Sequence, residues 1–423
     1  MPAGAIDYTW QTTLRTEWAG NIDTGRDQSL RLDLSPQLDL SLGDSVELTA
    51  IGRLRTEDNN TAGFDHLSLS AFDQITRPQI IGDSTAATLR ELYIATEISG
   101  IHLTLGKQQV VWGEADGLKV LDIVNPQSFQ YFILEEFEQS RIPTWMVNLE
   151  TVVAGWDTQF LWIPDQTYHA LPEDGSTWAF SSPQLVPSAA GLAPNTTVRM
   201  DKTDKPGKNI RDADTGLRLA NNWRGWDFSL NYFYHYDDLP VLHRRATPGP
   251  SPGIVLTPKY HRTHTFGGTA NNAFGDWVLR TEVGYSTDRY LLSNDVGNTD
   301  GITKGNEIAY VLGLDWSGLS NTLISAQLFQ SHFSENNSVR DKKEANATLL
   351  AQRLFWNDTL TLEVIWLGSL NSGDGLLRPK ISYEWQDDFK TWVGSDIFYG
   401  DKTGLFGQFH HNDQLSIGVE VDF

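Results

Sequence analysis

"SLRLDLSPQLDLSL", from Ser29 to Leu42, alternates apolar and polar residues along nearly its whole length. One face carries Leu30, Leu32, Leu34, Leu38 and Leu40, and the other carries Arg31, Asp33, Ser35, Gln37 and Asp39. Side chains of a β-strand point alternately to its two faces, so the pattern predicts a strand with one apolar and one polar face. Such a strand suits a wall that separates an apolar medium from water.

The same alternation recurs along the chain to its last residue. Further examples are "SVELTAIGRLRTE" (45–57), "TLTLEVIWLGSL" (359–370), "RPKISYEWQ" (378–386) and "QLSIGVEVDF" (414–423). Short and long links alternate between such segments. The tight links are Gly43-Asp44, Ser99-Gly100, Ala154-Gly155, Arg224-Gly225, Gly275-Asp276, Gly318-Leu319, Asn357-Asp358 and Asp387-Asp388. Turns at one rim and loops at the other are typical of an up-and-down barrel.

The sequence therefore predicts an all-β fold: a transmembrane antiparallel up-and-down β-barrel of about 18 strands, with 16 as the alternative count. Residues 1–423 form one domain. The links 164–212 and 237–259 are predicted to be long extracellular loops, and the piece 66–72 is an alternative extra strand. A β-sandwich or propeller with an aromatic core is disfavoured, because so many segments are long enough to cross a bilayer.

Composition excludes several other classes of protein. The net charge of −22 argues against a nucleic-acid binder, and the absence of cysteine excludes disulfides and thiolate metal sites. No apolar run is long enough for a transmembrane helix. The start, "MPAGAIDYTWQTTLRTEW", lacks the regions of a signal peptide, so an exported protein would be numbered here in its mature form.

One long link, 112–143, differs from an ordinary loop. Its part "NPQSFQYFILEEFEQSRIP" (125–143) carries aromatic residues at helical spacing, with Asn125 expected as the helix cap and Pro126 in the first turn. An exposed apolar face needs a partner, so we expect this partly helical segment to fold into the lumen and narrow it. The predicted constriction residues are Trp112, Glu114, Asp116, Asp122, Phe132, Glu135, Glu136, Glu138 and Arg141. The aromatic ones either form an apolar slide or, as we favour, anchor the segment.

Charged residues on the polar faces of the strands are predicted to line the lumen. They are Arg31, Arg53, Arg55, Arg280, Glu282, Arg378, Lys380 and Glu384. Two arrangements fit them equally well. Opposed rows would set up a transverse field that selects ions, and neighbouring strands would otherwise pair their charges across the wall.

The stretch from Gly106 to Glu150, which contains this link, also resembles a known family. "GKQQVVWGEADGLKVLDIVNPQSF" and "EEFEQSRIPTWMVNLE" are similar to a group of Gram-negative outer-membrane proteins that contain a domain of unknown function and often lie near exporters of the RND/MMPL type. The shared features are Gly106, Lys107 and Gln108; Trp112, Gly113 and Glu114; Asn125 and Pro126; and Pro143, Trp145 and Met146. The resemblance covers about 45 residues, and it implies an outer-membrane β-barrel with a transport role but no substrate.

We therefore expect a porin-like channel in the outer membrane that passes small, amphipathic or hydrophobic solutes passively. Alternatives are a closed barrel that partners an export system or displays a binding surface, and, less favoured, a lipid hydrolase. No catalytic motif marks an enzyme. Expected partners are outer-membrane lipid, lipopolysaccharide and the barrel assembly machinery, which would read the C-terminal Phe423 as a signal; the oligomeric state stays open.

No cofactor or resident metal is predicted. The stretches 293–301 and 371–375 carry carboxylates with glycines, as calcium loops do, but ordinary turns use the same residues. The histidine groups His261, His264 and His410, His411 are expected to be ordinary polar residues of the wall or surface.

Overall fold

A computed structural model describes residues 6–43, 45–58, 68–186, 197–207, 209–247, 253–295 and 297–423. Eighteen antiparallel strands form a closed barrel, which confirms the predicted fold. In ring order they are β1 (Ile6–Asn21), β2 (Asp27–Leu42), β3 (Val46–Asp58), β5 (Thr85–Ile98), β6 (Ile101–Gln108), β7 (Thr144–Val153), β8 (Trp156–Ile163), β10 (Asp214–Trp223), β11 (Trp226–Tyr236), β14 (Arg262–Phe274), β15 (Trp277–Leu292), β16 (Ile302–Trp316), β17 (Thr322–Phe333), β18 (Lys343–Phe355), β19 (Leu360–Ser369), β20 (Gly375–Gln386), β21 (Phe389–Tyr399) and β22 (Gln414–Asp422).

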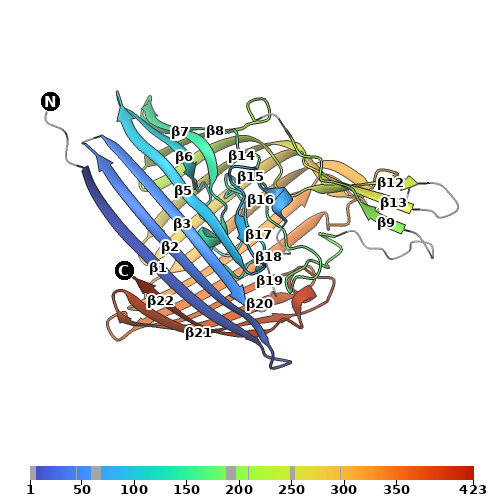
Figure 1. Cartoon of the computed structure of the whole chain (residues 1–423). Helices are drawn as coiled ribbons and strands as arrows, with labels where there is room; N and C mark the ends of the chain where they lie inside the picture. The colour runs from blue at the N-terminus through green and yellow to red at the C-terminus, as the bar shows by residue number, and fades with distance from the viewer. Residues whose placement is uncertain are drawn as a thin grey trace.

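The ring closes where the first strand meets the last. β22 pairs with β1 in antiparallel register from Thr13 with Asp422 to Asn21 with Gln414 (Figure 1). The backbones of Phe423 and Thr12 extend this pairing, since each N–H donates to the other's carbonyl, at 3.0 and 3.2 Å. Closure pairs the edge of β22 along its whole length and that of β1 from Thr12 onward.

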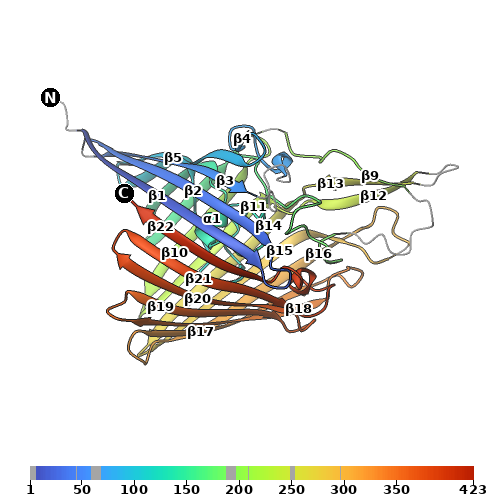
Figure 2. The ribbon, with the colours of Figure 1, turned by 60° about the horizontal axis from the view of Figure 1, so that its bottom comes forward.

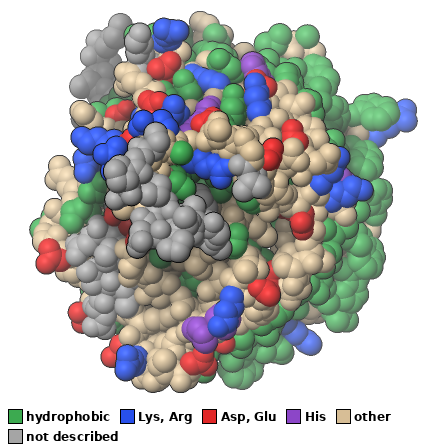
Figure 3. All heavy atoms as spheres, turned by 90° about the vertical axis from the view of Figure 1, so that its right-hand side faces the viewer, with side chains coloured by type: hydrophobic (Ala, Val, Ile, Leu, Met, Phe, Trp, Pro, Cys, Tyr) green, Lys and Arg blue, Asp and Glu red, His purple; other side chains and the backbone are tan. Residues whose placement is uncertain are grey.

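Alternation along the strands sorts side chains between the two faces of the wall. On β2, Leu30 and Leu32 are 42% and 39% exposed on the outer face, whereas Arg31 and Asp33 are 8% and 7% exposed inside. Figure 3 looks onto the end of the barrel, where charged side chains gather, and the hydrophobic outer wall appears along its right-hand edge. The outer face thus has the apolar character that a bilayer requires.

The tight links lie together at one rim, at the left of Figure 1. The β5–β6 turn has Ser99 at φ 54° and Gly100 at φ 79°, and two residues of positive φ make a two-residue hairpin that matches the twist of its strands. Large aromatic side chains are exposed beside these turns, among them Trp223, Trp277, Trp356 and Trp385. They match one of the aromatic girdles of a membrane barrel. Asp44, from the first predicted turn, lies outside the described residues.

The long links carry structure of their own at the opposite rim. β9 (Thr197–Met200), β13 (Gly253–Lys259) and β12 (Val241–Thr247) form a three-stranded sheet that projects beyond the barrel (Figures 1 and 2). The predicted loops 164–212 and 237–259 are therefore partly β-structure. The extra strand considered at 66–72 is wrong for its described part, because Leu69–Ala71 is the 3₁₀ helix η2. β4 (Gln79–Ile81) pairs with β5, and Gly407–Phe409 forms the 3₁₀ helix η3.

No helix in the described parts of the chain is long and apolar enough to cross a membrane. The single α-helix of those parts is α1 (Phe137–Ser140), which lies in the link between β6 and β7.

Candidate functional site: the insert inside the barrel

The link between β6 and β7, residues 109–143 and called the insert below, lies inside the ring of strands, where Figure 2 shows α1. Its helical content is smaller than its aromatic spacing predicted. No helix begins at Asn125, and only one turn forms, at Phe137–Ser140. Phe132 adopts a left-handed backbone conformation with φ 54°, which interrupts the expected helix in its middle.

The side chain of Asn125 forms hydrogen bonds at both ends of the insert instead of capping a helix. Its side-chain oxygen accepts the N–H of Val110 at 2.7 Å. Its amide nitrogen donates to the carbonyls of Gln108 and Ile142 and to Thr144 Oγ1, each at 3.2 Å. The side chain is only 1% exposed. One amide therefore joins the chain at both ends of the insert to a residue near its midpoint.

A carboxylate of the wall holds the first half of the insert. Glu282 on β15 accepts the backbone N–H of Ala115 at 2.7 Å and that of Leu121 at 3.0 Å, and it also accepts the N–H of Glu114. Glu282 is 3% exposed. The predicted luminal charge thus binds backbone amides rather than facing the solvent of the pore.

Neighbouring strands continue this contact. Arg280 Nη1 lies 3.0 Å from a carboxylate oxygen of Asp116, and Gln327 on β17 exchanges hydrogen bonds with the side chain and backbone of Asp116 at 3.2 and 3.0 Å. Asn271 on β14 donates to the carboxylate of Glu114. Three strands therefore position the segment from Glu114 to Asp116.

Glycines in the wall admit the large apolar side chains of the insert. A Cβ atom on Gly267 would lie 2.5 Å from Leu121, and one on Gly216 would lie 2.7 Å from Trp112. Trp112 is 2% exposed, packs edge-on against Phe233 and donates its indole N–H to Gln159 at 2.7 Å. Trp112 is thus an anchor and is not among the residues that line the cavity described below.

The second half of the insert meets the long-link rim through an aromatic cluster. Phe132 is 4% exposed and packs with Trp178, Phe398, Phe406 and Phe409, the nearest ring centroid being that of Phe409 at 4.7 Å. These partners come from β21, from the link after it and from the link after β8. The insert and two other links therefore share one small core.

An ion cluster ties the two halves of the insert together. Asp122 lies 2.6 Å from Lys119 Nζ and 2.9 Å from Arg141 Nη2. Lys119 also lies over the ring of Phe137, 4.3 Å from its centroid. Burial lowers the pKa of Lys119 to about 8, against the attraction of Asp122. Asp122 and Arg141 therefore act within the insert.

Glu135 crosses to the opposite wall. Its carboxylate is 2.7 Å from Arg55 on β3 and 3.7 Å from Arg31 on β2. Burial opposes its ionisation, but Arg55, Arg31 and Arg53 outweigh burial and lower the pKa of Glu135. The neighbouring Tyr131 donates its hydroxyl to Glu57 at 2.9 Å. The insert is thus braced on both sides of the barrel.

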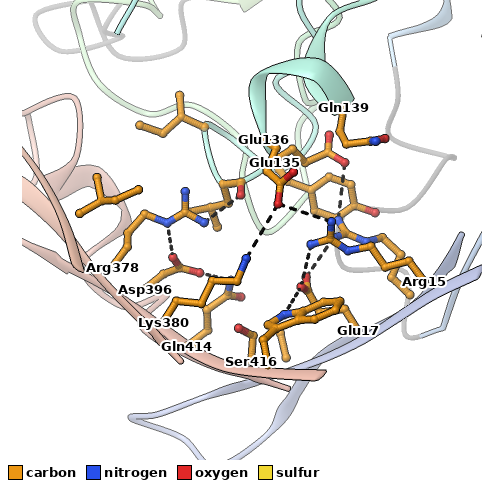
Figure 4. Close-up of a pocket in the computed structure, with 18 of the residues that line it drawn as sticks. Arg15, Glu17, Glu135, Glu136, Gln139, Arg378, Lys380, Asp396, Gln414 and Ser416 are labelled. Atoms are coloured by element: carbon orange, nitrogen blue, oxygen red, sulfur yellow. Dashed lines mark hydrogen bonds and ion pairs between the residues drawn. The ribbon is translucent and has the colours of Figure 1, made fainter. Parts of the chain in front are cut away.

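A cavity of about 350 Å³ remains between the insert and the wall formed by β1, β2 and β19–β22 (Figure 4). Glu136 points into it and is 63% exposed, with Arg15 Nη1 at 3.7 Å and Lys380 Nζ at 3.8 Å. Arg378 donates to the carbonyl of Leu134 at 2.8 Å. Apolar side chains share the lining, among them Ile133, Phe137, Ile365 and Trp392. The lining of the cavity therefore combines charged and apolar side chains.

Most charges of the wall pair between neighbouring strands. Arg31 lies 2.9 Å from Glu17, Arg55 lies 2.6 Å from Asp33, and Arg378 lies 2.6 Å from Asp396. The second of the two predicted arrangements therefore accounts for these residues. Across the cavity, the insert adds Glu135 and Glu136 opposite the basic side chains, so an opposed arrangement exists there as well.

The remaining predicted residues lie away from this cavity. Glu384 is exposed near the tight-turn end of β20. The carboxylate of Glu138 has no hydrogen bond or ion pair among the described residues, while its backbone carbonyl accepts Arg90 Nη2 at 2.7 Å. Arg53 lines a second, smaller cavity. Arg15, Glu17 and Asp396 were not predicted to line the lumen, although each follows the alternation that identified Arg31.

The carboxylates of the two glycine-containing loops have different partners. Asp295 accepts the N–H of Gly297 at 2.8 Å, which is ordinary turn chemistry, whereas Asp374 accepts the N–H groups of Phe406 and Gly407, in the link between β21 and β22, at 2.6 and 3.0 Å. Among the described residues, no three His, Asp or Glu side chains gather as metal ligands. His261 faces His243 with Nε2 atoms 2.8 Å apart.

Comparison with known proteins places the chain in a family. The profile of DUF1302, described as a protein of unknown function, matches residues 31–423. The chain belongs to the DUF1302 family. No curated protein matches this DUF1302 sequence.

Solved structures share the fold of this DUF1302 chain. OccAB3 of Acinetobacter baumannii aligns with a TM-score of 0.54 and 9% identity over 99% of each chain. OccK2 (OpdF) of Pseudomonas aeruginosa gives 0.55 and 9%, and OccK5 (OpdH) of the same organism gives 0.53 and 12%, each over 99% of this chain and 98% of the other. At this identity the likeness concerns the fold, which is that of outer-membrane porins.

Proposed function

We propose that this DUF1302 protein is a channel of the Gram-negative outer membrane that passes small solutes passively through a lumen narrowed by residues 112–143. The observation that carries the proposal is the 350 Å³ cavity between the insert and the wall. A fixed constriction with charges on both sides sorts solutes by size and charge without moving parts.

The cavity favours small amphipathic solutes. Its cations Arg15 and Lys380 suit a carboxylate, and Trp392 and Ile365 suit an apolar or ring-shaped body. Two proteins of similar fold from Pseudomonas aeruginosa have been solved with solutes that carry a carboxylate: OccK2 (OpdF) in complex with glucuronate, and OpdK with vanillate. We extend this preference to the present chain.

Liposome swelling tests the proposal. Proteoliposomes with the wild-type protein should swell in glucuronate and in vanillate, and Lys380→Gln should slow both relative to a neutral sugar. Lys402→Gln, an exposed residue of the β21–β22 link, is the matched control and should leave uptake unchanged. Wild-type liposomes that do not swell in any of these solutes would contradict the channel.

A closed barrel is the second candidate. It is favoured by the bonds that tie the insert to strands on opposite sides of the ring, from Arg55 on β3 to Gln327 on β17. In that case the projecting sheet of β9, β12 and β13 would be a docking or display surface, and a partner such as an exporter of the RND/MMPL type would be required. Absence of conductance at every voltage would favour this candidate.

A further inference from the structure

A second cavity, of about 40 Å³, lies between the insert and the wall formed by β3, β5 and β6. Four cationic side chains line it: Arg53, Arg55, Arg90 and Lys107. Among the described residues, no acidic side chain lines it, whereas the main cavity mixes both signs of charge. This basic cavity is separate from the proposed passage and shares only Arg55 with it.

Three of the four cations form no ion pair in the part of the chain that the structure describes. Arg55 pairs with Asp33 and Glu135. Among the described residues, no carboxylate oxygen lies within 4.0 Å of the charged nitrogens of Arg53, Arg90 or Lys107. Glu91 and Asp165 attract Arg90 and Lys107 from beyond that distance, and their carboxylates accept hydrogen bonds from Gln109 at 2.8 Å and from Thr167 at 2.6 Å.

Backbone carbonyls accept hydrogen bonds from Lys107 and Arg90, but one nitrogen of Arg53 has no acceptor. Lys107 is 1% exposed and donates to the carbonyl of Leu89 at 2.6 Å. Arg90 is 7% exposed and donates to three carbonyls of the insert, those of Glu138, Gln139 and Arg141. Arg53 Nη1 is shielded from solvent and has no hydrogen-bond partner in the described structure. One guanidinium N–H group therefore lacks an acceptor at a cavity where like charges meet.

Buried cations that face one another repel, and a buried charge outside a close ion pair is costly. Arg53, Arg90 and Lys107 surround one cavity, and the acids that attract them form no ion pair with them among the described residues. We propose that the basic cavity is a binding site for one small anionic group of about the size of chloride, held by Arg53, Arg90 and Lys107.

The volume of the basic cavity limits the size of the ligand that it can hold. A space of about 40 Å³ accommodates a single ion or a carboxylate head, together with at most a water or two, and excludes a whole sugar acid. The hydroxyl groups of Thr88 and Ser128 also line the cavity and are additional donors for an anion. The same chemistry fits an inorganic ion or the carboxylate of a small solute.

Bromide is the probe. Crystals of the full-length protein soaked in sodium bromide should show an anomalous peak in the basic cavity, and Arg53→Gln should abolish that peak. Arg199→Gln removes an exposed arginine of β9, whose side chain is 69% exposed, and should leave the peak in place. This measurement does not depend on conductance, so it can fail while the channel proposal stands.

Each outcome decides the proposal. A wild-type crystal without a peak in the cavity would overturn it, whether or not the Arg53 variant folds, and so would an undiminished peak in Arg53→Gln. A peak that excess acetate displaces supports the site and identifies its ligand as a carboxylate from solution. A peak that acetate leaves unchanged supports the site and identifies its ligand as an inorganic anion.

Discussion

Replacing Asn125 with alanine should loosen the insert while leaving the barrel closed. The substitution removes the acceptor for the buried Val110 N–H, at 2.7 Å, and the donor for three oxygens at 3.2 Å. An unsatisfied buried N–H costs about 1–3 kcal/mol, and three long bonds to neutral oxygens contribute roughly 0.5 kcal/mol each. The docked state of the insert should therefore lose about 3 kcal/mol, which is about a hundredfold in its opening equilibrium.

Hydrogen exchange followed by mass spectrometry measures that opening. Amides within 110–142 should exchange about a hundredfold faster in Asn125→Ala, and amides of β16 and β17 should exchange as in the wild type. Asn222→Ala is the matched control, because it removes a single hydrogen bond to Asp227 at an exposed turn. Unchanged exchange within 110–142 would refute the role of Asn125 as the clasp of the insert.

Phe132→Ala should destabilise the aromatic cluster by about 3–5 kcal/mol, the usual cost of truncating a buried phenylalanine, and chymotrypsin, which cleaves after aromatic residues, should then cut the links around 164–186 and 400–413 faster; equal cleavage would contradict the cluster. Glu136→Gln should shift the reversal potential in a salt gradient toward anion selectivity without changing stability, because its carboxylate is 63% exposed between two cations; an unshifted potential would place it outside the passage. Burial, His243 and Lys259 lower the pKa of His261 to about 4 from 6.5 in the unfolded chain, so the unfolded state binds the extra proton and stability falls as the pH drops from about 6.5 to 4. His261→Phe should reduce that loss in thermal unfolding, and parallel curves for variant and wild type would contradict it.

The barrel could be predicted because the sequence pattern of each strand and turn is local and recurs along the chain. Each strand carries its own alternation, as Leu30 and Arg31 show, and each tight turn its own glycine or polar pair, as Ser99-Gly100 does. Register then follows from which face must meet lipid. The inward position of the insert followed from the same logic, since its apolar side chains needed a partner.

The roles of individual residues in the insert and in the wall around it could not be predicted, because they depend on contacts that are not local in the sequence. Asn125 has the sequence context of a helix cap, yet its amide bonds to both ends of a loop. Glu282 alternates like any luminal charge, yet it accepts backbone amides that lie far away in the chain. Gly216 and Gly267 leave room for Trp112 and Leu121. None of these roles has a short-range pattern, because the two sides of each contact lie at least 15 residues apart in the chain, and those of Glu282 lie 161–168 residues apart.

Single-channel conductance with and without the inner part of the insert tests the central claim most directly. Gln127 and Arg141 face each other as an antiparallel bridge, so a two-residue Asn-Gly turn can replace residues 128–140 and keep the clasp at Asn125. In planar bilayers the wild type should show small, charge-selective openings, and the shortened protein should show several-fold larger and less selective ones. Equal conductance of the two proteins would contradict a constriction formed by the insert.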